Sequence, residues 1–164
     1  MNSFRAFFCS LLLLMAPPMY AEPPVGYPFV HYDEGLKRAA ASGRPVFLYF
    51  GRYGCGYCGK VNAETFSSPK VREVYTRHYE LVYLDAESGH RIRLPSGEWI
   101  TESELGARLN VFSTPVFLYL QPDGTPIFRA PGYKTVADLL AFDRFIQSGA
   151  WRRQTINEFL EQRR

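Results

Sequence analysis

The sequence lacks the features that mark several protein classes. Its apolar segment at residues 7–16 covers ten positions, about half of the twenty or so that a membrane-spanning helix needs. The net charge is only +3 and no basic block precedes Arg163 and Arg164, so nucleic-acid binding is not indicated. No internal repeat is visible, and residues 22–28 form a short proline-rich tract. With 46% hydrophobic and 21% charged residues, the chain has the composition of a globular protein rather than a disordered one.

Residues 1–21 have the pattern of a secretory signal peptide. A single early positive charge precedes the short apolar core, and two prolines end that core a few residues later. We expect cleavage after Ala21. An uncleaved anchor is the alternative, because Met19 stands where a small residue is preferred. The remaining residues, 22–164, have the length of one domain with its own hydrophobic core.

Cysteine is scarce, and the few cysteines present constrain the chemistry most. Of three in the chain, Cys9 falls in the signal segment, so the mature protein would keep only Cys55 and Cys58. This pair follows residues 45–50, a continuously apolar run typical of a strand buried on both faces, and it opens a segment with helical character. Cys55 would then lie at a helix N-terminus, where free N–H groups and the helix dipole lower the pKa of a thiol. Cys58, one turn further, would be close enough to attack a mixed disulfide.

Zinc binding and a purely structural disulfide are the alternatives for this pair. Tetrahedral zinc needs four ligands, but the chain has no second cysteine pair, and His31, His78 and His90 lack the close spacing of a zinc finger. Structural disulfides usually close loops longer than two residues. We therefore predict a redox-active pair that uses no metal and no cofactor.

Periodicity and capping signals predict alternating helices and strands. The expected helices cover residues 32–42, from the cysteines to about 66, 69–78, 101–109, 135–147 and 151–164. The expected strands cover residues 45–50, 80–85, 116–120 and 125–129, and a small hairpin is expected within residues 86–100. This order predicts an α/β fold with a central mixed sheet and helices on both faces.

At this level the sequence resembles the thioredoxin superfamily over about residues 32–148. It looks most like the secreted, single-domain bacterial members associated with sulfur metabolism and periplasmic disulfide reduction. The features that carry the resemblance are the strand feeding Cys55-Gly56-Tyr57-Cys58, the dipeptide Thr114-Pro115 before a strand, and the Asp123-Gly124 turn followed by Gly132.

The resemblance implies a thioredoxin fold and a thiol–disulfide oxidoreductase activity. Cys55 would be the nucleophile and Cys58 the resolving thiol, and the two would form the disulfide of the oxidised protein. The peptide bond before Pro115 would be cis and lie beside the cysteines. Substrate binding would fall to Gly56, Tyr57, Thr114 and Pro115.

The sequence also departs from thioredoxin itself. Tyr49 stands where thioredoxin has a buried aspartate that assists proton transfer, and Glu64 is a possible substitute on the helix. The Gly-Tyr dipeptide between the cysteines is similar to that of periplasmic disulfide-isomerase catalytic domains, which dimerise through an additional N-terminal domain. Residues 22–31 are too few for such a domain, so we expect a monomer.

Smaller expectations concern the surroundings of the cysteines. Arg52 and Lys60 are candidates to stabilise a thiolate electrostatically, with solvated surface cations as the alternative. His90 lies in a polar insertion and is assigned no role. Four aromatic side chains are expected to form an apolar rim around the reactive sulfur: Tyr53, Tyr57, Phe112 and Tyr133. For Phe112 and Tyr133, packing against the rest of the protein is the alternative.

These expectations lead to a periplasmic enzyme that reduces disulfides of partner proteins and takes electrons from a membrane dithiol donor. An oxidising compartment would otherwise leave the pair as a disulfide at rest. A disulfide oxidase or isomerase is the alternative within the same chemistry. A thioredoxin scaffold that only binds a partner is the alternative from another class.

Overall fold

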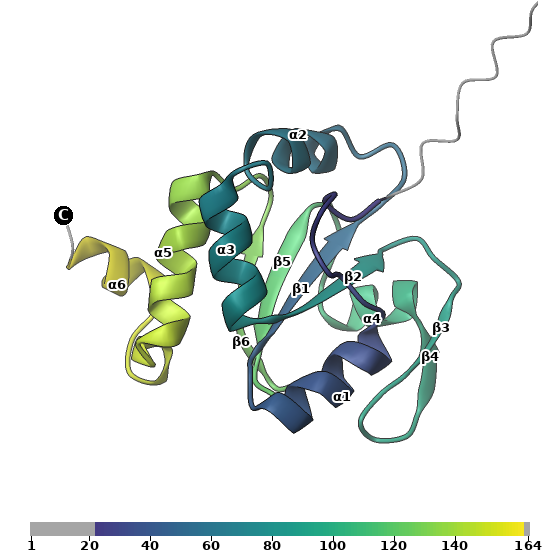
Figure 1. The fold of residues 1–164 in the computed structure, drawn as a ribbon. Coiled ribbons are helices and arrows are strands. Elements are labelled where there is room, and N and C mark those ends of the chain that lie inside the picture. Colours follow the sequence, from purple (N-terminus) through teal and green to yellow (C-terminus); the bar gives the residue numbers. More distant parts are fainter. Residues whose placement is uncertain (1–21, 163–164) are drawn as a thin grey trace, which may run out of the picture.

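The computed structural model describes residues 22–162 and shows a central sheet with helices on both faces (Figure 1). The predicted signal peptide, residues 1–21, lies outside the described residues. The helices are α1 (Tyr32–Ser42), α2 (Gly56–Glu64), α3 (Pro69–His78), α4 (Glu102–Arg108), α5 (Val136–Gln147) and α6 (Ile156–Glu161). The strands are β1 (Val46–Gly51), β2 (Glu80–Asp85), β3 (Arg91–Arg93), β4 (Trp99–Thr101), β5 (Val116–Leu120) and β6 (Pro126–Pro131).

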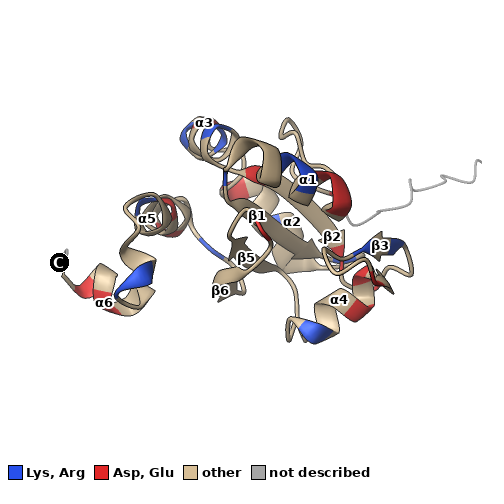
Figure 2. Cartoon of the chain, turned by 90° about the horizontal axis from the view of Figure 1, so that it is seen from below, with Lys and Arg blue, Asp and Glu red and all other residues tan. Residues whose placement is uncertain are grey.

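The main sheet has the strand order β2-β1-β5-β6. Strand β1 runs parallel to β2 and antiparallel to β5, and β5 pairs antiparallel with β6, so the sheet is mixed as predicted. All residues of β1 and β5 are buried, which explains why both strands are continuously apolar in sequence. Figure 2 shows the charged residues on the helices and the hairpin, with none on these two central strands.

Side chains that alternate along β1 divide the core into two layers. Phe47 and Tyr49 pack with residues of α2, α3 and α5 on one face of the sheet. Leu48 and Phe50 pack with α1, α4 and the β3–β4 hairpin on the other. The period-two geometry of a strand produces this division, because successive side chains point to opposite faces. The arrangement places the C-terminal end of β1 directly before the cysteine pair.

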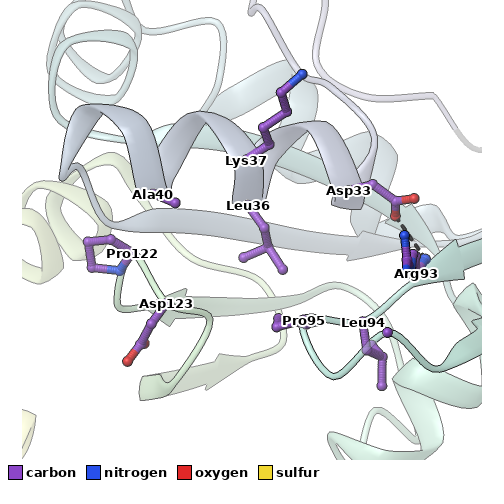
Figure 3. Close-up of a pocket in the computed structure, with 10 residues that line it drawn as sticks. Asp33, Leu36, Lys37, Ala40, Arg93, Leu94, Pro95, Pro122 and Asp123 are labelled. Atoms are coloured by element: carbon purple, nitrogen blue, oxygen red, sulfur yellow. Dashed lines mark hydrogen bonds between the residues drawn. The ribbon is translucent and has the colours of Figure 1, made fainter.

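The predicted hairpin within residues 86–100 is present between β2 and α4. Strands β3 and β4 pair antiparallel with Ile92 opposite Ile100, and both isoleucines are buried against the α1 side of the core. Thr101 caps α4, as its capping-box pattern predicts. A groove of about 540 Å³ lies where α1, this hairpin and the β5–β6 turn meet. Figure 3 shows Leu36 of α1 projecting toward the two loops across this groove.

Most predicted elements are confirmed, but the predicted helix over residues 151–164 is wrong at its start. Gly149 takes a left-handed conformation with φ of 68°, and a 3₁₀ turn at Ala150–Arg152 follows it. The helix proper begins only after Thr155, whose hydroxyl accepts the backbone N–H of Glu158. The capping box at Thr155 therefore sets the boundary, because an N-cap residue lies outside its own helix. Within residues 22–162, no helix combines the length and apolar character needed to cross a bilayer.

Candidate active site

Cys55 and Cys58 form a disulfide at the N-terminus of α2, with their Cα atoms 5.2 Å apart. The turn from β1 into α2 passes through Gly54, whose φ of 66° lies in the left-handed region that favours glycine. Cys55 is the N-cap residue, and its Sγ accepts the backbone N–H of Cys58 at 3.1 Å. In the reduced protein the same N–H group and the helix dipole would stabilise a thiolate at Cys55.

The two sulfur-bearing residues differ in exposure. Cys55 is partly exposed, whereas Cys58 is 7% exposed and belongs to the aromatic core layer. Cys55 is therefore the more accessible of the two sulfur-bearing residues to an external reagent. The roles of nucleophile and resolving thiol stay predictions.

We expect limiting iodoacetamide at neutral pH to label the reduced protein first at Cys55. The physical reason is the combination of greater exposure and thiolate stabilisation by the Cys58 N–H group. Peptide mass spectrometry after short reaction times measures the ratio of the two alkylated peptides. Cys58→Ser serves as the control and should keep the fast-labelling site. Faster labelling of Cys58 in the wild-type protein would contradict this assignment.

The Thr114–Pro115 peptide bond is cis and lies beside the cysteine pair. The carbonyl oxygen of Thr114 is 3.4 Å from Cys55 Sγ, and Pro115 is buried at the start of β5. A disulfide sulfur carries no proton, so this distance is a contact rather than a hydrogen bond in the oxidised protein. Within residues 22–162, the hydroxyl of Thr114 is a buried polar group without a hydrogen-bond partner. Such a group costs about 1–3 kcal/mol until it finds a partner.

Three exposed aromatic side chains lie close in the chain to the cysteine pair or to Thr114. Tyr53, Tyr57 and Phe112 are 58%, 63% and 83% exposed, and each lies within two residues of Cys55 or Thr114 in the chain. Exposed apolar groups that gather near one functional segment are typical of an interaction surface. The fourth predicted rim residue, Tyr133, differs because it is half-buried, and its hydroxyl donates to Glu64 Oε2 at 2.7 Å.

Both cations proposed to stabilise the thiolate have other partners. Arg52 forms an ion pair with Glu87 at 3.0 Å, which offsets part of its charge. Lys60 Nζ lies 5.0 Å from the ring centroid of Tyr133. Among the described residues, the backbone N–H of Cys58 is the hydrogen-bond donor that contacts the Cys55 sulfur.

The position of thioredoxin's buried aspartate is occupied by a neutral phenol. Burial raises the pKa of Tyr49 far above its ordinary value, and its hydroxyl donates to Asn62 Oδ1 at 3.2 Å. Tyr49 therefore cannot accept a proton from Cys58 as a carboxylate would. Glu64 is exposed, and six residues at about 100° each place it about 120° around the helix axis from Cys58, so its carboxylate lies on another side of α2.

The groove of Figure 3 is separate from this site, since neither cysteine lines it.

A cluster of two histidines and a glutamate was not expected from the sequence. Ligand atoms of His31, His90 and Glu102 all lie within 4.8 Å of one another. Their spacing in the chain gave no signal, because each comes from a separate structural segment.

The fold and the paired cysteines beside a cis-proline define a protein of the thioredoxin class. The family profile described as "Thioredoxin-like domain" matches residues 32–147, and the chain belongs to this family.

Solved structures agree with this membership. The chain is similar to a thioredoxin-fold protein from Helicobacter pylori, with 22% identity, a TM-score of 0.61 and coverage of 74% of this chain and 80% of that one. A thioredoxin from Thermus thermophilus is 27% identical, with a TM-score of 0.60 and coverage of 73% and 86%. A putative disulphide-isomerase from Bacteroides thetaiotaomicron is 23% identical, with a TM-score of 0.58 and coverage of 73% and 89%. A search of curated protein sequences finds no match.

Proposed function

We propose that this protein is a periplasmic thiol–disulfide oxidoreductase that reduces disulfides in partner proteins. The observation that carries the proposal is the Cys55–Cys58 disulfide at the start of α2, in contact with the cis Thr114–Pro115 segment. A purely structural disulfide would not need one partly exposed sulfur at a helix N-terminus. That placement favours thiol–disulfide exchange.

The chemistry proceeds through two exchanges in which the atoms and electrons balance. The Cys55 thiolate attacks one sulfur of the substrate disulfide, forms a mixed disulfide and releases the other substrate sulfur as a thiolate. The Cys58 thiolate then attacks Cys55 Sγ and releases the second substrate thiolate. The enzyme gains a disulfide while the substrate gains two electrons, and two protons end on the substrate thiols. An external dithiol must return the enzyme to its reduced form.

Cys58 must lose its proton before the second exchange. The structure offers no buried carboxylate at the position of Tyr49, and Glu64 points away from the sulfur by helix geometry. The substrate thiolate released in the first step is itself a base and lies next to the disulfide it has just left. We therefore assign proton removal from Cys58 to that leaving thiolate or to solvent, rather than to a fixed side chain.

The substrate segment would lie against Gly56, Tyr57, Thr114 and Pro115. The exposed rings around the cysteines suit apolar segments of a partner chain, because they bury area without deep insertion. The unpartnered Thr114 hydroxyl supports the same placement, since a bound backbone amide or carbonyl would satisfy it.

Location and electron source complete the proposal. The signal-like pattern of residues 1–21 supports export, and an oxidising compartment requires a donor to keep the cysteines reduced. We assign this role to a membrane dithiol donor. One copy of the chain carries every group used in the mechanism, so the protein is proposed to act as a monomer.

Turnover separates this proposal from a scaffold that only binds a partner. The wild-type protein, supplied with dithiothreitol, should accelerate reduction of insulin disulfides at catalytic concentrations. A matched control lacking both active-site thiols, Cys55→Ser with Cys58→Ser, should not exceed dithiothreitol alone. Equal rates for wild type and control would overturn the enzymatic proposal and favour the binding module.

A further inference from the structure

A second cluster of reactive side chains lies outside the cysteine site. His31, His90 and Glu102 each offer one ligand atom, and these three atoms lie within 4.8 Å of one another. The two imidazole rings have centroids 5.3 Å apart and are inclined by 34°. Both histidines are exposed, whereas Glu102 is 5% exposed. Neither cysteine belongs to the cluster, so its chemistry is independent of the proposed disulfide exchange.

Backbone contacts bring the three residues together from separate segments. His31 is the N-cap residue of α1, and its neighbour Val30 forms a parallel bridge to Val82 of β2. His90 directly precedes β3, and its carbonyl accepts the backbone N–H of Glu102 at 3.0 Å. The β3–β4 pairing thus fixes two of the residues, while the bridge to β2 fixes the third.

The buried carboxylate is already oriented by neighbouring groups. Glu102 Oε2 accepts the backbone N–H of Asp85 at 3.1 Å. Burial raises the pKa of the Glu102 carboxyl above its usual value, although hydrogen bonds from Asp85 and Ser88 favour its ionised form. Across residues 22–162 no lysine or arginine pairs with this carboxylate. The two cluster histidines are the groups whose charge would favour the ionised carboxylate, and a cation bound between them would offset the cost of burying it.

The donor set identifies the kind of cation. Two imidazole nitrogens and one carboxylate oxygen form a ligand set that zinc uses, with the fourth position left to water. Imidazole ligands favour zinc and neighbouring transition metals over magnesium or calcium. We propose that His31, His90 and Glu102 bind one Zn²⁺ ion and thereby tie the N-terminus of α1 to the β3–β4 hairpin and α4.

The geometry requires only a small adjustment. Zinc bonds of roughly 2.0–2.2 Å in a tetrahedral site place ligand atoms about 3.3 Å apart. The ligand atoms must therefore approach from their present separations of at most 4.8 Å. Both histidine rings are exposed, so rotation of their side chains can bring the nitrogens closer to the carboxylate without disturbing the core. The backbone N–H of Asp85, which donates to Glu102 Oε2, holds the carboxylate in place as hydrogen bonds to zinc ligands commonly do.

Calorimetric titration with Zn²⁺ tests the site. The full chain is used in its disulfide form and with Cys9→Ser, so that no free thiol competes for metal. We expect one binding site in this protein. Because loss of an outer-shell group already weakens metal binding roughly 10–100-fold, His31→Gln or His90→Gln should weaken it by about 100-fold or more. His78→Gln is the matched control, since His78 pairs with Asp143 elsewhere, and its affinity should be unchanged.

Two further measurements keep the proposal open to refutation if a variant folds poorly. In folded Glu102→Gln protein, checked by circular dichroism, the affinity should fall as for the histidine variants. Unchanged affinity would mean that a surface histidine pair alone binds the ion and would overturn the three-ligand site. In the unmutated site, Co²⁺ should give the intense visible bands of a four-coordinate ion. Absence of Zn²⁺ binding, weak octahedral Co²⁺ bands, or a wild-type affinity in either the His31→Gln or the His90→Gln protein would each overturn it.

Discussion

Replacing Cys55 by serine is expected to lower disulfide-reduction turnover by about 10³-fold or more, because it removes the attacking sulfur. Cys58→Ser should also stop turnover, but for a different reason. Its Cys55 thiolate still attacks a substrate disulfide, and no second thiol is present to release the product. Mixed disulfides should therefore accumulate with Cys58→Ser and be nearly absent with Cys55→Ser. Non-reducing electrophoresis after incubation with an oxidised protein substrate measures both.

The two variants control for each other, since each replaces one sulfur by one oxygen in the same helical turn. Thermal unfolding of both reduced proteins should be similar to that of the reduced wild type, which would show that the fold is retained. Accumulation of mixed disulfides with Cys55→Ser instead of Cys58→Ser would reverse the assigned roles. Turnover by either variant at the wild-type rate would remove both residues from the mechanism.

Phe47→Ala is expected to reduce the free energy of unfolding by about 3–5 kcal/mol. Phe47 is fully buried in β1, and its ring contacts aromatic rings from α3 and β5. Its loss leaves a cavity between the sheet and α3 that packed neighbours cannot readily fill. Since a domain of this size is typically stable by about 5–15 kcal/mol, the variant should unfold at markedly lower denaturant concentration. Equilibrium urea unfolding measures the change.

Phe112→Ala is the matched control, because it makes the same phenylalanine-to-alanine substitution at an exposed position. Phe112 is 83% exposed, so its truncation should change stability by no more than about 0.5 kcal/mol. If the ring belongs to the substrate rim, the same variant should raise the KM for a protein substrate while leaving kcat near the wild-type value. A stability loss equal to that of Phe47→Ala would contradict the exposure assigned to Phe112.

Elements whose ends are encoded locally could be predicted from the sequence. Helix Tyr32–Ser42 ends where Gly43 takes a left-handed conformation, and Pro69–His78 begins after Ser68, whose hydroxyl accepts the Val71 N–H. These signals act within a few residues, so no tertiary information is needed. The wrongly placed start of the last helix has a local cause as well, because Ala150–Arg152 forms a separate 3₁₀ turn before the cap at Thr155.

The geometry of the cysteine site could not be predicted from local sequence patterns alone. Position alone placed Cys55 at a helix N-terminus, but the approach of Thr114 to its sulfur depends on the pairing of β1 with β5. The register in which Phe50 lies opposite Val116 brings these distant segments together. The sequence supplied this proximity only through resemblance to a known family.

The histidine–glutamate cluster was not predictable from spacing. Zinc motifs are usually recognised by ligands a few residues apart, whereas here the residues lie on three segments. Their approach depends on the bridge between Val30 and Val82 and on the pairing of β3 with β4. The argument against zinc from the sequence concerned the cysteine pair, and it did not address a site assembled from distant segments.

The redox potential of the Cys55–Cys58 couple tests the proposed reductase most directly. Stabilisation of the Cys55 thiolate raises the potential, but Gly56 and Tyr57 between the cysteines include no lysine, arginine or histidine that would add cationic stabilisation. We predict from equilibration with glutathione a value nearer roughly −270 mV, typical of reductants, than roughly −120 mV, typical of strong oxidants. A value close to the strong-oxidant end, together with fast oxidation of reduced unfolded substrates, would contradict the proposal and indicate a disulfide oxidase.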